Sequence, residues 1–339
     1  MIRNIAFALA VTLLGLTGIT VAAPGNFPAY TNAADAGPDF VKQGEYRGTW
    51  TNNGEADDVG AQIIALGDGK FRVVLFDDGL PGAGWDRSMK STAYDAETVE
   101  HVVTFSGDNI AGTLRDGLLK LTDSGGQPKG ELKKVERQSP TLGAAPPEGT
   151  VVLLDGKSRD QFTGGGRFVD GLFVMGPAED GSGRGEAQSK QSFGSFTMHV
   201  EFLLPFMPTA TGQARGNSGV YLQNRYECQV LDSFGLSGED NECGGFYKFR
   251  KPDVNMCLPP LTWQTYDIDF TAPKFDAAGA KTKDARVTVR HNGVVIHDDF
   301  ELPKQTPGGL NNEGPTGPLK LQDHGNPVAF RNIWVVPVN

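Results

Sequence analysis

The sequence predicts an all-β protein built from two units of short antiparallel strands. Three observations lead to this fold class. The chain is rich in turn-forming residues, with 45 Gly and 21 Pro among 339 residues. Apolar residues alternate with polar ones in many short segments instead of recurring at helical spacing. Tight-turn residues separate these segments, which favours hairpins between neighbouring strands.

The first 23 residues are typical of a secretory signal peptide. Arg3 supplies an early positive charge, an apolar run extends from Ile5 to about Leu16, and small residues stand at Ala22 and Ala23. We therefore expect a secreted or periplasmic protein. No later stretch is long and apolar enough to span a bilayer, so no membrane span is expected.

The charge and the motifs of the sequence limit the classes of partner and cofactor that the protein is expected to bind. The formal net charge is −10 and no basic stripe is visible, which argues against nucleic acid as a partner. The sequence has no GxSxG elbow, phosphate-binding loop, HExxH or redox-cofactor motif, so no cofactor is required by any motif. The acidic segment Leu236–Glu242 and the pair Asp267 and Asp269 offer oxygen ligands, so a divalent cation such as Ca²⁺ is possible, although solvated acidic loops are commoner.

The first unit is predicted to be a small antiparallel β-meander or barrel-like domain over residues 45–138. An extended leader, residues 24–44, precedes it. Strand patterns such as AQIIAL and FRVVLF follow one another with Gly and Asp turns between them. A Pro, Gly and Ala-rich linker, residues 139–149, then marks the domain boundary.

The second unit, residues 150–339, also reads as a sheet structure. From Ser195 to Leu204, apolar side chains alternate with Thr197, His199 and Glu201, which assigns one strand face to a core and the other to a polar surface. An Asn292-Gly293 turn between two alternating segments predicts a hairpin. The remaining histidines, at positions 101, 291 and 297, are expected at the surface.

All three cysteines lie in the second unit. Export would permit one disulfide, for which Cys243 and Cys257 are the candidate pair and Cys228 the leftover thiol. Connectivity does not follow from sequence, and three buried reduced cysteines are the alternative.

The densest group of polar residues lies between Arg215 and Gly235. Strand alternation places Arg225, Glu227 and Gln229 on one face of a strand. Asn217, Asp232 and Glu201 are expected to reach the same face if the sheet forms in the expected order. Such a surface fits a sugar-binding cleft beside an aromatic ring, although a solvated sheet face with cross-strand ion pairs is the simpler alternative.

Several segments of the second unit resemble the 3-keto-disaccharide hydrolase domain family. The segments that carry the resemblance, in chain order, are NSGVYLQNRYECQVLDSFG, NECGGFY, VNMCLPPLTWQTYDIDF, ARVTVRHNGVVIHDDFELP and GPLKLQDHGNPVAFRNIWVVP. The resemblance covers about residues 150–339 and implies a concanavalin A-like jelly-roll β-sandwich. It also implies an enzyme that cleaves glycosides already oxidised at C3 of the sugar.

The resemblance implies a set of site residues. Glu227 and His324 are the acid/base candidates, since a C3 ketone acidifies the C2 proton and a base can then drive loss of the anomeric substituent. The predicted substrate-binding residues are Arg225, Gln229, Asn217, Tyr221 and Gln322, with Asp232 and Glu201 either binding substrate or orienting Arg225 and a histidine. A separate sugar 3-dehydrogenase would have to supply the substrate. The alternative is a lectin-like, non-catalytic carbohydrate-binding module.

Overall fold

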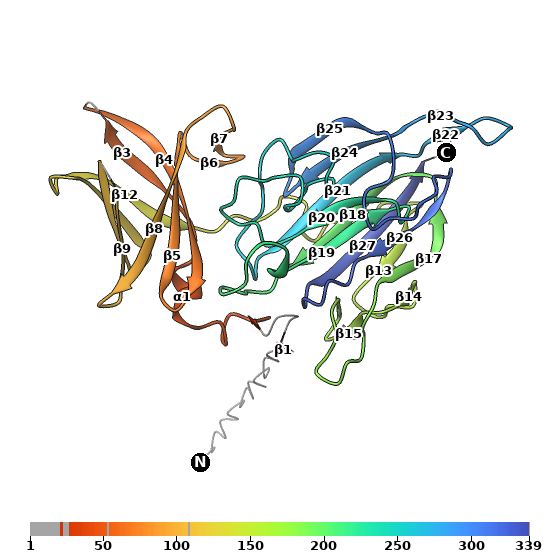
Figure 1. Cartoon of the computed structure of the whole chain (residues 1–339), viewed down its shortest axis with the longest axis horizontal. Helices are drawn as coiled ribbons and strands as arrows, with labels where there is room; N and C mark the ends of the chain where they lie inside the picture. Colours follow the sequence, from red (N-terminus) through yellow and green to blue (C-terminus); the bar gives the residue numbers. More distant parts are fainter. Residues whose placement is uncertain (1–20, 23–26, 53, 108, 339) are drawn as a thin grey trace, which may run out of the picture.

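The computed structural model describes residues 21–22, 27–52, 54–107 and 109–338. Two β-rich bodies lie side by side, a barrel formed by the first unit and a sandwich formed by the second (Figure 1). The predicted fold class, a small barrel-like domain followed by a β-sandwich of jelly-roll type, is confirmed. The signal-peptide prediction falls almost entirely outside the described residues.

The barrel is closed by eight antiparallel strands. Its order around the wall is β10-β11-β12-β3-β4-β5-β8-β9. The strands are β3 (Gly44–Asn52), β4 (Glu55–Gly67), β5 (Lys70–Asp77), β8 (Ser91–Val99), β9 (Val102–Ser106), β10 (Ile110–Arg115), β11 (Leu118–Asp123) and β12 (Pro128–Val135). Two short strands, β6 (Leu80–Pro81) and β7 (Gly84–Trp85), lie between β5 and β8.

One end of the barrel is capped by α1 (Gly37–Lys42), which the sequence analysis included in an extended leader. That expectation was wrong at this segment. Pro38 fits the first turn of a helix, and Phe40 turns toward the barrel core and packs edge-on against Phe206 of the sandwich unit. The Asp39 carboxylate accepts the backbone N–H of Gly69 in the β4–β5 turn at 2.9 Å. The helix thus closes this end of the barrel.

The sandwich is built from a larger and a smaller antiparallel sheet. The larger has the order β15-β16-β27-β18-β21-β24-β25, with β13 paired to β27, and the smaller has the order β14-β17-β26-β19-β20. The larger sheet contains β13 (Val151–Leu154), β15 (Arg167–Val169), β16 (Leu172–Val174), β18 (Ser195–Leu203), β21 (Trp263–Thr271), β24 (Ala285–His291), β25 (Val294–Leu302) and β27 (Ala329–Val338). The smaller contains β14 (Phe162–Gly164), β17 (Ala187–Phe193), β19 (Ser218–Leu222), β20 (Tyr226–Val230) and β26 (Gly317–Leu321).

The sandwich core follows the predicted alternation. Phe196, Met198, Val200 and Phe202 of β18 are all buried in one cluster with apolar residues of the smaller sheet. The predicted hairpin is also present, because β24 and β25 flank Asn292 and Gly293, both in the left-handed region at φ 50° and 81°. This geometry is that of a two-residue type I′ turn.

The remaining short elements lie at the periphery. They are β1 (Val21–Ala22), β2 (Pro28–Ala29), β22 (Lys274–Phe275), β23 (Lys281–Lys283) and one 3-10 turn, Gly212–Ala214. Among the described residues, no helix has the length and apolar character needed to cross a membrane.

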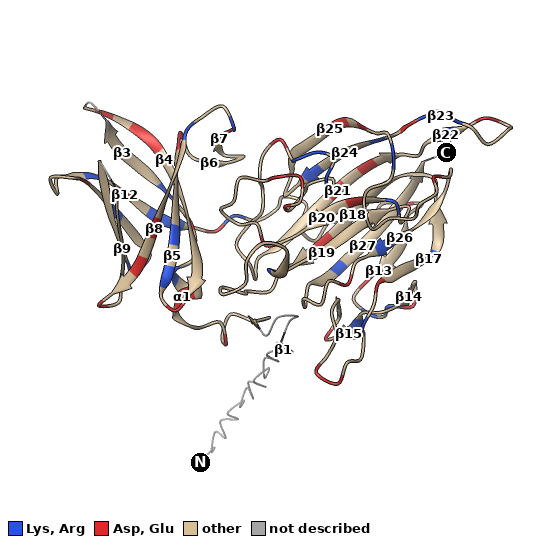
Figure 2. Ribbon diagram, viewed as in Figure 1, with Lys and Arg blue, Asp and Glu red and all other residues tan. Residues whose placement is uncertain are grey.

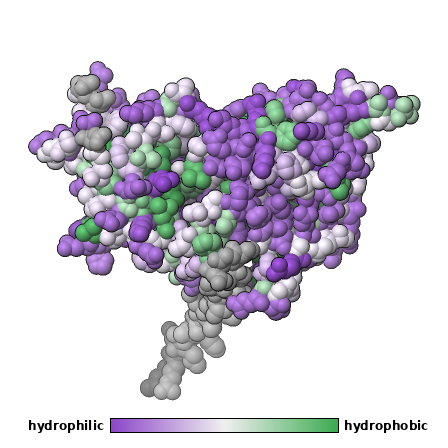
Figure 3. Space-filling model, viewed as in Figure 1, coloured by the Kyte–Doolittle hydropathy of each residue, from purple (hydrophilic) through white to green (hydrophobic). Residues whose placement is uncertain are grey.

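The two bodies share packed and hydrogen-bonded contacts. Ile64, Val74 and Phe76, on the outer face of the barrel wall, belong to the same buried cluster as the sandwich core. The Arg87 guanidinium donates to the carbonyls of Gly238, Pro252 and Asp253. Lys/Arg and Asp/Glu are interspersed over both bodies (Figure 2). In the view of Figure 3, hydrophobic residues reach the surface mainly over the barrel.

Candidate functional site

The outward face of the smaller sheet carries a row of polar residues. Val220 of β19, Cys228 of β20 and Leu321 of β26 point into the core, so their neighbours along each strand point outward. Strand register places Tyr221 opposite Glu227 on one side and opposite Lys320 on the other. A carboxylate, a phenol and an amine therefore stand in line across three adjacent strands.

Glu227 is the most perturbed carboxyl of this row. It is 2% exposed, and burial raises its pKa to about 7, although the Tyr221 hydroxyl and the Lys320 charge act in the opposite direction. Gly219 makes room for it, since a Cβ at that position would lie 2.3 Å from Oε1. Within the described residues this buried oxygen has no hydrogen-bond partner. A carboxyl group poised near neutral pH with a free oxygen fits a general base.

Lys320 is almost completely buried on the β26 side of the row, next to Tyr221. Its Nζ lies 3.7 Å from the centre of the Tyr221 ring and donates to Glu186 Oε1 at 3.1 Å and to the Gly308 carbonyl at 2.9 Å. Burial, followed by the neighbouring Glu227 charge, raises the pKa of Tyr221, so the phenol stays protonated. The row thus combines one fixed cation with one hydroxyl donor.

Amide side chains extend the row. Gln322 donates to the Tyr221 hydroxyl at 3.3 Å, and Gln229 and Asn217 both donate to Gln213 Oε1, at 3.1 and 3.2 Å. In the described chain, Gln322 Oε1 and Asn217 Oδ1 are buried without partners. Buried amide oxygens left unpaired are costly and rare, so in this row they need a bound water or a polar ligand as partner.

The 303–316 loop covers the Glu227 end of the row, while the other end is more open. Thr306 Oγ1 accepts the Glu227 backbone N–H at 2.9 Å, and the Gly308 carbonyl binds Lys320. Toward the opposite end, Gln213 and Gln322 are half-buried and His324, which follows β26, is exposed. The row is thus closed over Glu227 and more exposed toward Gln322.

The comparisons with known proteins agree with this description. The family model of the 3-keto-alpha-glucoside-1,2-lyase-like domain matches residues 149–336. The chain belongs to this family. The resemblance stated from the sequence is thereby confirmed, and the matched residues are those of the sandwich. The barrel lies outside the family domain.

Solved structures are similar to the same share of the chain. The crystal structure of a candidate glycosyl hydrolase from Parabacteroides distasonis ATCC 8503, at 2.13 Å resolution, is 33% identical in sequence to this chain. The match covers 57% of this chain and 85% of that chain, with a TM-score of 0.50. The crystal structure of a second candidate glycosyl hydrolase of that organism, at 1.70 Å resolution, is 18% identical over 57% of this chain and 99% of its own, with a TM-score of 0.43. The comparison with curated proteins gave no match.

Within the family domain, the structure brings together five of the residues predicted from the sequence: Asn217, Tyr221, Glu227, Gln229 and Gln322. Sequence analysis missed Gln213, Glu186 and Lys320. The signal for Lys320 was present, because it precedes Gln322 by two positions in an alternating strand and so shares its face.

Arg225 does not join the row, contrary to the prediction. Gln223 and Asn224, both at positive φ, form the turn before β20, and Arg225 follows that turn. Its guanidinium donates to the carbonyls of Asn312, Gln223 and Thr316. Arg225 therefore fastens the 303–316 loop to the sheet.

Asp232 also lies apart from the row. Its carboxylate pairs with Arg215 at 2.6 Å, and Arg215 in turn donates to the Ala65 carbonyl of the barrel. Asp232 thus supports the junction of the two bodies. Within the described residues, the His324 side chain forms no hydrogen bond or ion pair. His324 is exposed to solvent, whereas Glu227 is buried.

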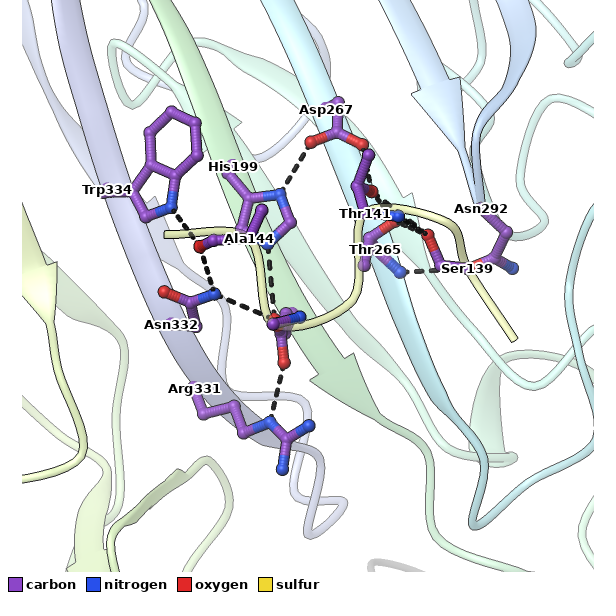
Figure 4. Close-up of polar contacts among 12 residues, drawn as sticks. Ser139, Thr141, Ala144, His199, Thr265, Asp267, Asn292, Arg331, Asn332 and Trp334 are labelled. Atoms are coloured by element: carbon purple, nitrogen blue, oxygen red, sulfur yellow. Dashed lines mark hydrogen bonds and ion pairs between the residues drawn. The ribbon is translucent and has the colours of Figure 1, made fainter. Parts of the chain in front are cut away.

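Glu201 stands on the larger sheet, so the expectation that it shares a face with Glu227 was wrong. On β18, Glu201 and His199 are covered by the 139–149 linker, which packs against the sheet instead of running free (Figure 4). Glu201 accepts from Arg331, Asn332 and the Gly143 backbone N–H at 2.6 to 2.8 Å.

The pKa values of this second cluster reflect full pairing. Burial acts to raise the pKa of Glu201, but the hydrogen bonds from His199, Asn332 and Arg331 outweigh it and lower the pKa to about 2. Burial acts to lower the pKa of His199, yet its bonds to Asp267 at 2.6 Å and to Glu201 raise it. The cluster ties the linker to the sandwich.

The three cysteines are free and buried, so the predicted Cys243–Cys257 disulfide is not formed in the structure. Cys243 contacts the Tyr266 hydroxyl at 3.2 Å, and the Cys257 thiol donates to the Leu231 carbonyl at 3.5 Å. The alternative of three buried reduced cysteines is the one observed.

Two histidines expected at the surface are buried. His291 bonds to Gln264 at 2.9 Å, and His297 donates to the Gly244 carbonyl at 2.7 Å. Burial lowers their pKa values to about 3 and about 4, respectively. Over the part of the chain that is described, no group of three or more His, Cys, Asp or Glu has the arrangement to hold a metal ion.

Proposed function

We propose that this protein is a carbohydrate-active enzyme that cleaves 3-keto-glycosides, by elimination of the anomeric substituent followed by hydration. The observation that carries the proposal is the Glu227 carboxyl, buried on a polar sheet face with its pKa near 7 and one oxygen free. Membership of the 3-keto-alpha-glucoside-1,2-lyase-like family and the likeness to a candidate glycosyl hydrolase support the same substrate class.

The first step is removal of the C2 proton by Glu227. The C3 ketone makes this proton acidic, and the electron pair of the C2–H bond becomes the C1–C2 double bond as the C1–O bond breaks. The leaving oxygen takes up a proton, and water then adds to the unsaturated ketone to give the free 3-keto sugar. No oxocarbenium ion is needed on this route.

The other residues of the row have matching roles. The Lys320 charge and the protonated Tyr221 hydroxyl are placed to stabilise the enolate that forms as the proton leaves. The free amide oxygens of Asn217 and Gln322 can accept sugar hydroxyls. We assign the exposed His324 to the rim, where an imidazole can pass a proton to the leaving oxygen.

Two further proposals follow from the sequence. Because no redox cofactor motif is present, a separate sugar 3-dehydrogenase must oxidise the substrate first.

The N-terminal pattern supports export to the periplasm or medium. N-terminal sequencing of the mature protein from cell fractions tests this proposal. A mature protein that starts at residue 24 or a near neighbour would support export, and an intact Met1 in the cytoplasm would contradict it.

The substrate proposal is tested with a 3-keto-disaccharide beside the same disaccharide without the oxidation. We expect release of monosaccharide from the keto sugar alone. Elimination also predicts a primary isotope effect when C2 carries deuterium, whereas direct hydrolysis predicts none. Binding without turnover would show instead a lectin-like module, and equal cleavage of both sugars would show an ordinary glycosidase.

A further inference from the structure

The barrel holds a cavity at the end opposite α1. Its volume is about 500 Å³, within the range of small-molecule sites, and barrel mouths are a common place for such sites. Inward-pointing residues of neighbouring strands form the wall, since Leu75 lies opposite Thr92 and Val73 opposite Tyr94 in register. Deeper side chains such as Tyr46 and Phe71 fill the rest of the barrel toward the helix cap.

Two aromatic rings, Trp50 and Tyr94, line this cavity together with Leu75 and Ile110. A glycine leaves space for one of these rings, since a Cβ at Gly107 would lie 2.5 Å from the Tyr94 ring. The Trp50 indole N–H has no hydrogen-bond partner in the described part of the chain, unlike that of Trp85, which donates to Lys90.

Polar groups make up the rest of the wall. They are Thr51, Asp77, Lys90, Thr92, Asn109 and Lys129. Burial is the leading cause that raises the pKa of Asp77, and the nearby Lys90 charge acts in the opposite direction. No side-chain hydrogen bond to the Asp77 carboxylate is found among the described residues. The cavity lining thus combines an acceptor and several donors with two aromatic side chains.

We propose that the barrel mouth is a second, non-catalytic carbohydrate site that holds a neutral pyranose unit. A sugar presents C–H groups to Trp50 and Tyr94, while its hydroxyls donate to Asp77 and accept from Lys90 and Asn109. A fatty acyl chain would leave the Asp77 carboxylate desolvated without a partner. The site lies outside the family domain and does not depend on the chemistry at Glu227.

The test is calorimetric titration of the full chain carrying Glu227→Gln with maltotriose and with cellotriose, so that turnover plays no part. Saturable binding of at least one is expected. Asp77→Asn and Trp50→Ala should each weaken it about tenfold or more, from loss of a charged acceptor or a stacking face. Thermal unfolding checks that each variant is folded. If Trp50→Ala is not folded, the conservative Asp77→Asn variant alone decides the test.

Asp95→Asn is the matched control, because Asp95 lies on β8 with its side chain 91% exposed outside the cavity. It should leave affinity within about twofold. Absence of binding to both sugars, or binding that Asp77→Asn leaves unchanged, overturns the proposal. Displacement of bound sugar by decanoic acid would show an apolar-ligand site and overturns it as well. Failure of turnover at Glu227 would not affect any of these readouts.

Discussion

The two sheets of the sandwich carry buried polar clusters on their outer faces, and the clusters differ in how well their atoms are paired. Around Glu201, carboxylate oxygens accept from a guanidinium, an amide and a backbone N–H, and the pKa falls to about 2. Around Glu227, oxygens of three side chains have no partner within the described residues, and the pKa rises to about 7. At Glu201 the pairing is complete and holds the linker to the sheet, whereas unpaired acceptors beside a carboxyl of raised pKa single out the Glu227 cluster as the candidate site.

The largest expected effect is on turnover at the unpaired cluster. Glu227→Gln keeps the size of the side chain but removes the base, so turnover of a 3-keto-disaccharide should fall about 10³-fold. The free energy of unfolding at pH 8 should not fall, because burial disfavours the charge that the substitution removes. Initial rates and urea unfolding measure the two quantities.

Glu301→Gln is the control for this substitution, since Glu301 is an exposed carboxylate on β25. It should change neither rate nor stability noticeably. Full activity of Glu227→Gln would remove Glu227 from the mechanism.

The second expected effect is on stability at the paired cluster. Glu201→Gln leaves Arg331 and His199 without their carboxylate, which should lower the free energy of unfolding by about 3 kcal/mol, as for a broken buried ion pair. Turnover per folded molecule should stay close to wild type. Asp269→Asn, on the neighbouring strand and half-exposed, is the control and should cost less than about 1 kcal/mol. A large loss of turnover in the folded Glu201→Gln variant would contradict the assignment of the Glu201 cluster to structure and the Glu227 cluster to catalysis.

The third effect is the opposite pH dependence of the two clusters. Glu227 has a higher pKa folded than its ordinary 4.5, so its contribution to stability declines as pH rises from about 4.5 to 7, by on the order of 3 kcal/mol. Glu201 has a lower pKa folded, so its contribution declines as pH falls from about 4.5 to 2, by a similar amount.

Other groups titrate in the same range. The lowered pKa values of His291 and His297 cost stability as pH falls below about 6.5, so only the difference between wild type and each variant isolates one carboxyl. Urea unfolding of wild type, Glu227→Gln and Glu201→Gln from pH 3 to 8 provides these differences. The kcat/KM of wild type should rise with pH through about 7, and parallel stability profiles for all three proteins would refute the assignment.

The sequence could predict the faces of strands but not their tertiary partners. Alternation correctly placed Tyr221, Glu227 and Gln229 on one side of the smaller sheet, since a period of two is a local property. It could not show that Arg225 would meet carbonyls of the 303–316 loop, some 90 positions later. Nor could it show that Glu201 lies on the other sheet, because strand order is set by topology.

For the same reason, the sequence pattern did not predict which segments pack over the outer faces of the strands. The 139–149 linker has the composition of a free connector, yet Thr141 and Gly143 bond to Asp267 and Glu201 across the larger sheet. The expected surface histidines at 291 and 297 are buried among aromatic side chains of the sandwich core, His291 against Phe202 and Tyr266 and His297 against Phe246. Hydrophobic pattern reports which side of a strand meets the core, but not whether a loop covers the other side.

The smallest expected effect concerns His324, which follows β26 and is exposed, whereas Glu227 is buried. His324→Ala should lower kcat/KM for a 3-keto-disaccharide by about tenfold at most, because water can replace an exposed imidazole as proton donor. A substrate whose leaving group needs no proton distinguishes proton donation by His324 from a structural role of His324. With a 3-keto 4-nitrophenyl glucoside, the variant should match wild type, whereas Glu227→Gln should remain impaired. His101→Ala, an exposed turn histidine of the barrel, should match wild type on both substrates. Equal losses on both substrates would place His324 in substrate binding instead of proton transfer, since only the proton-transfer role depends on the leaving oxygen.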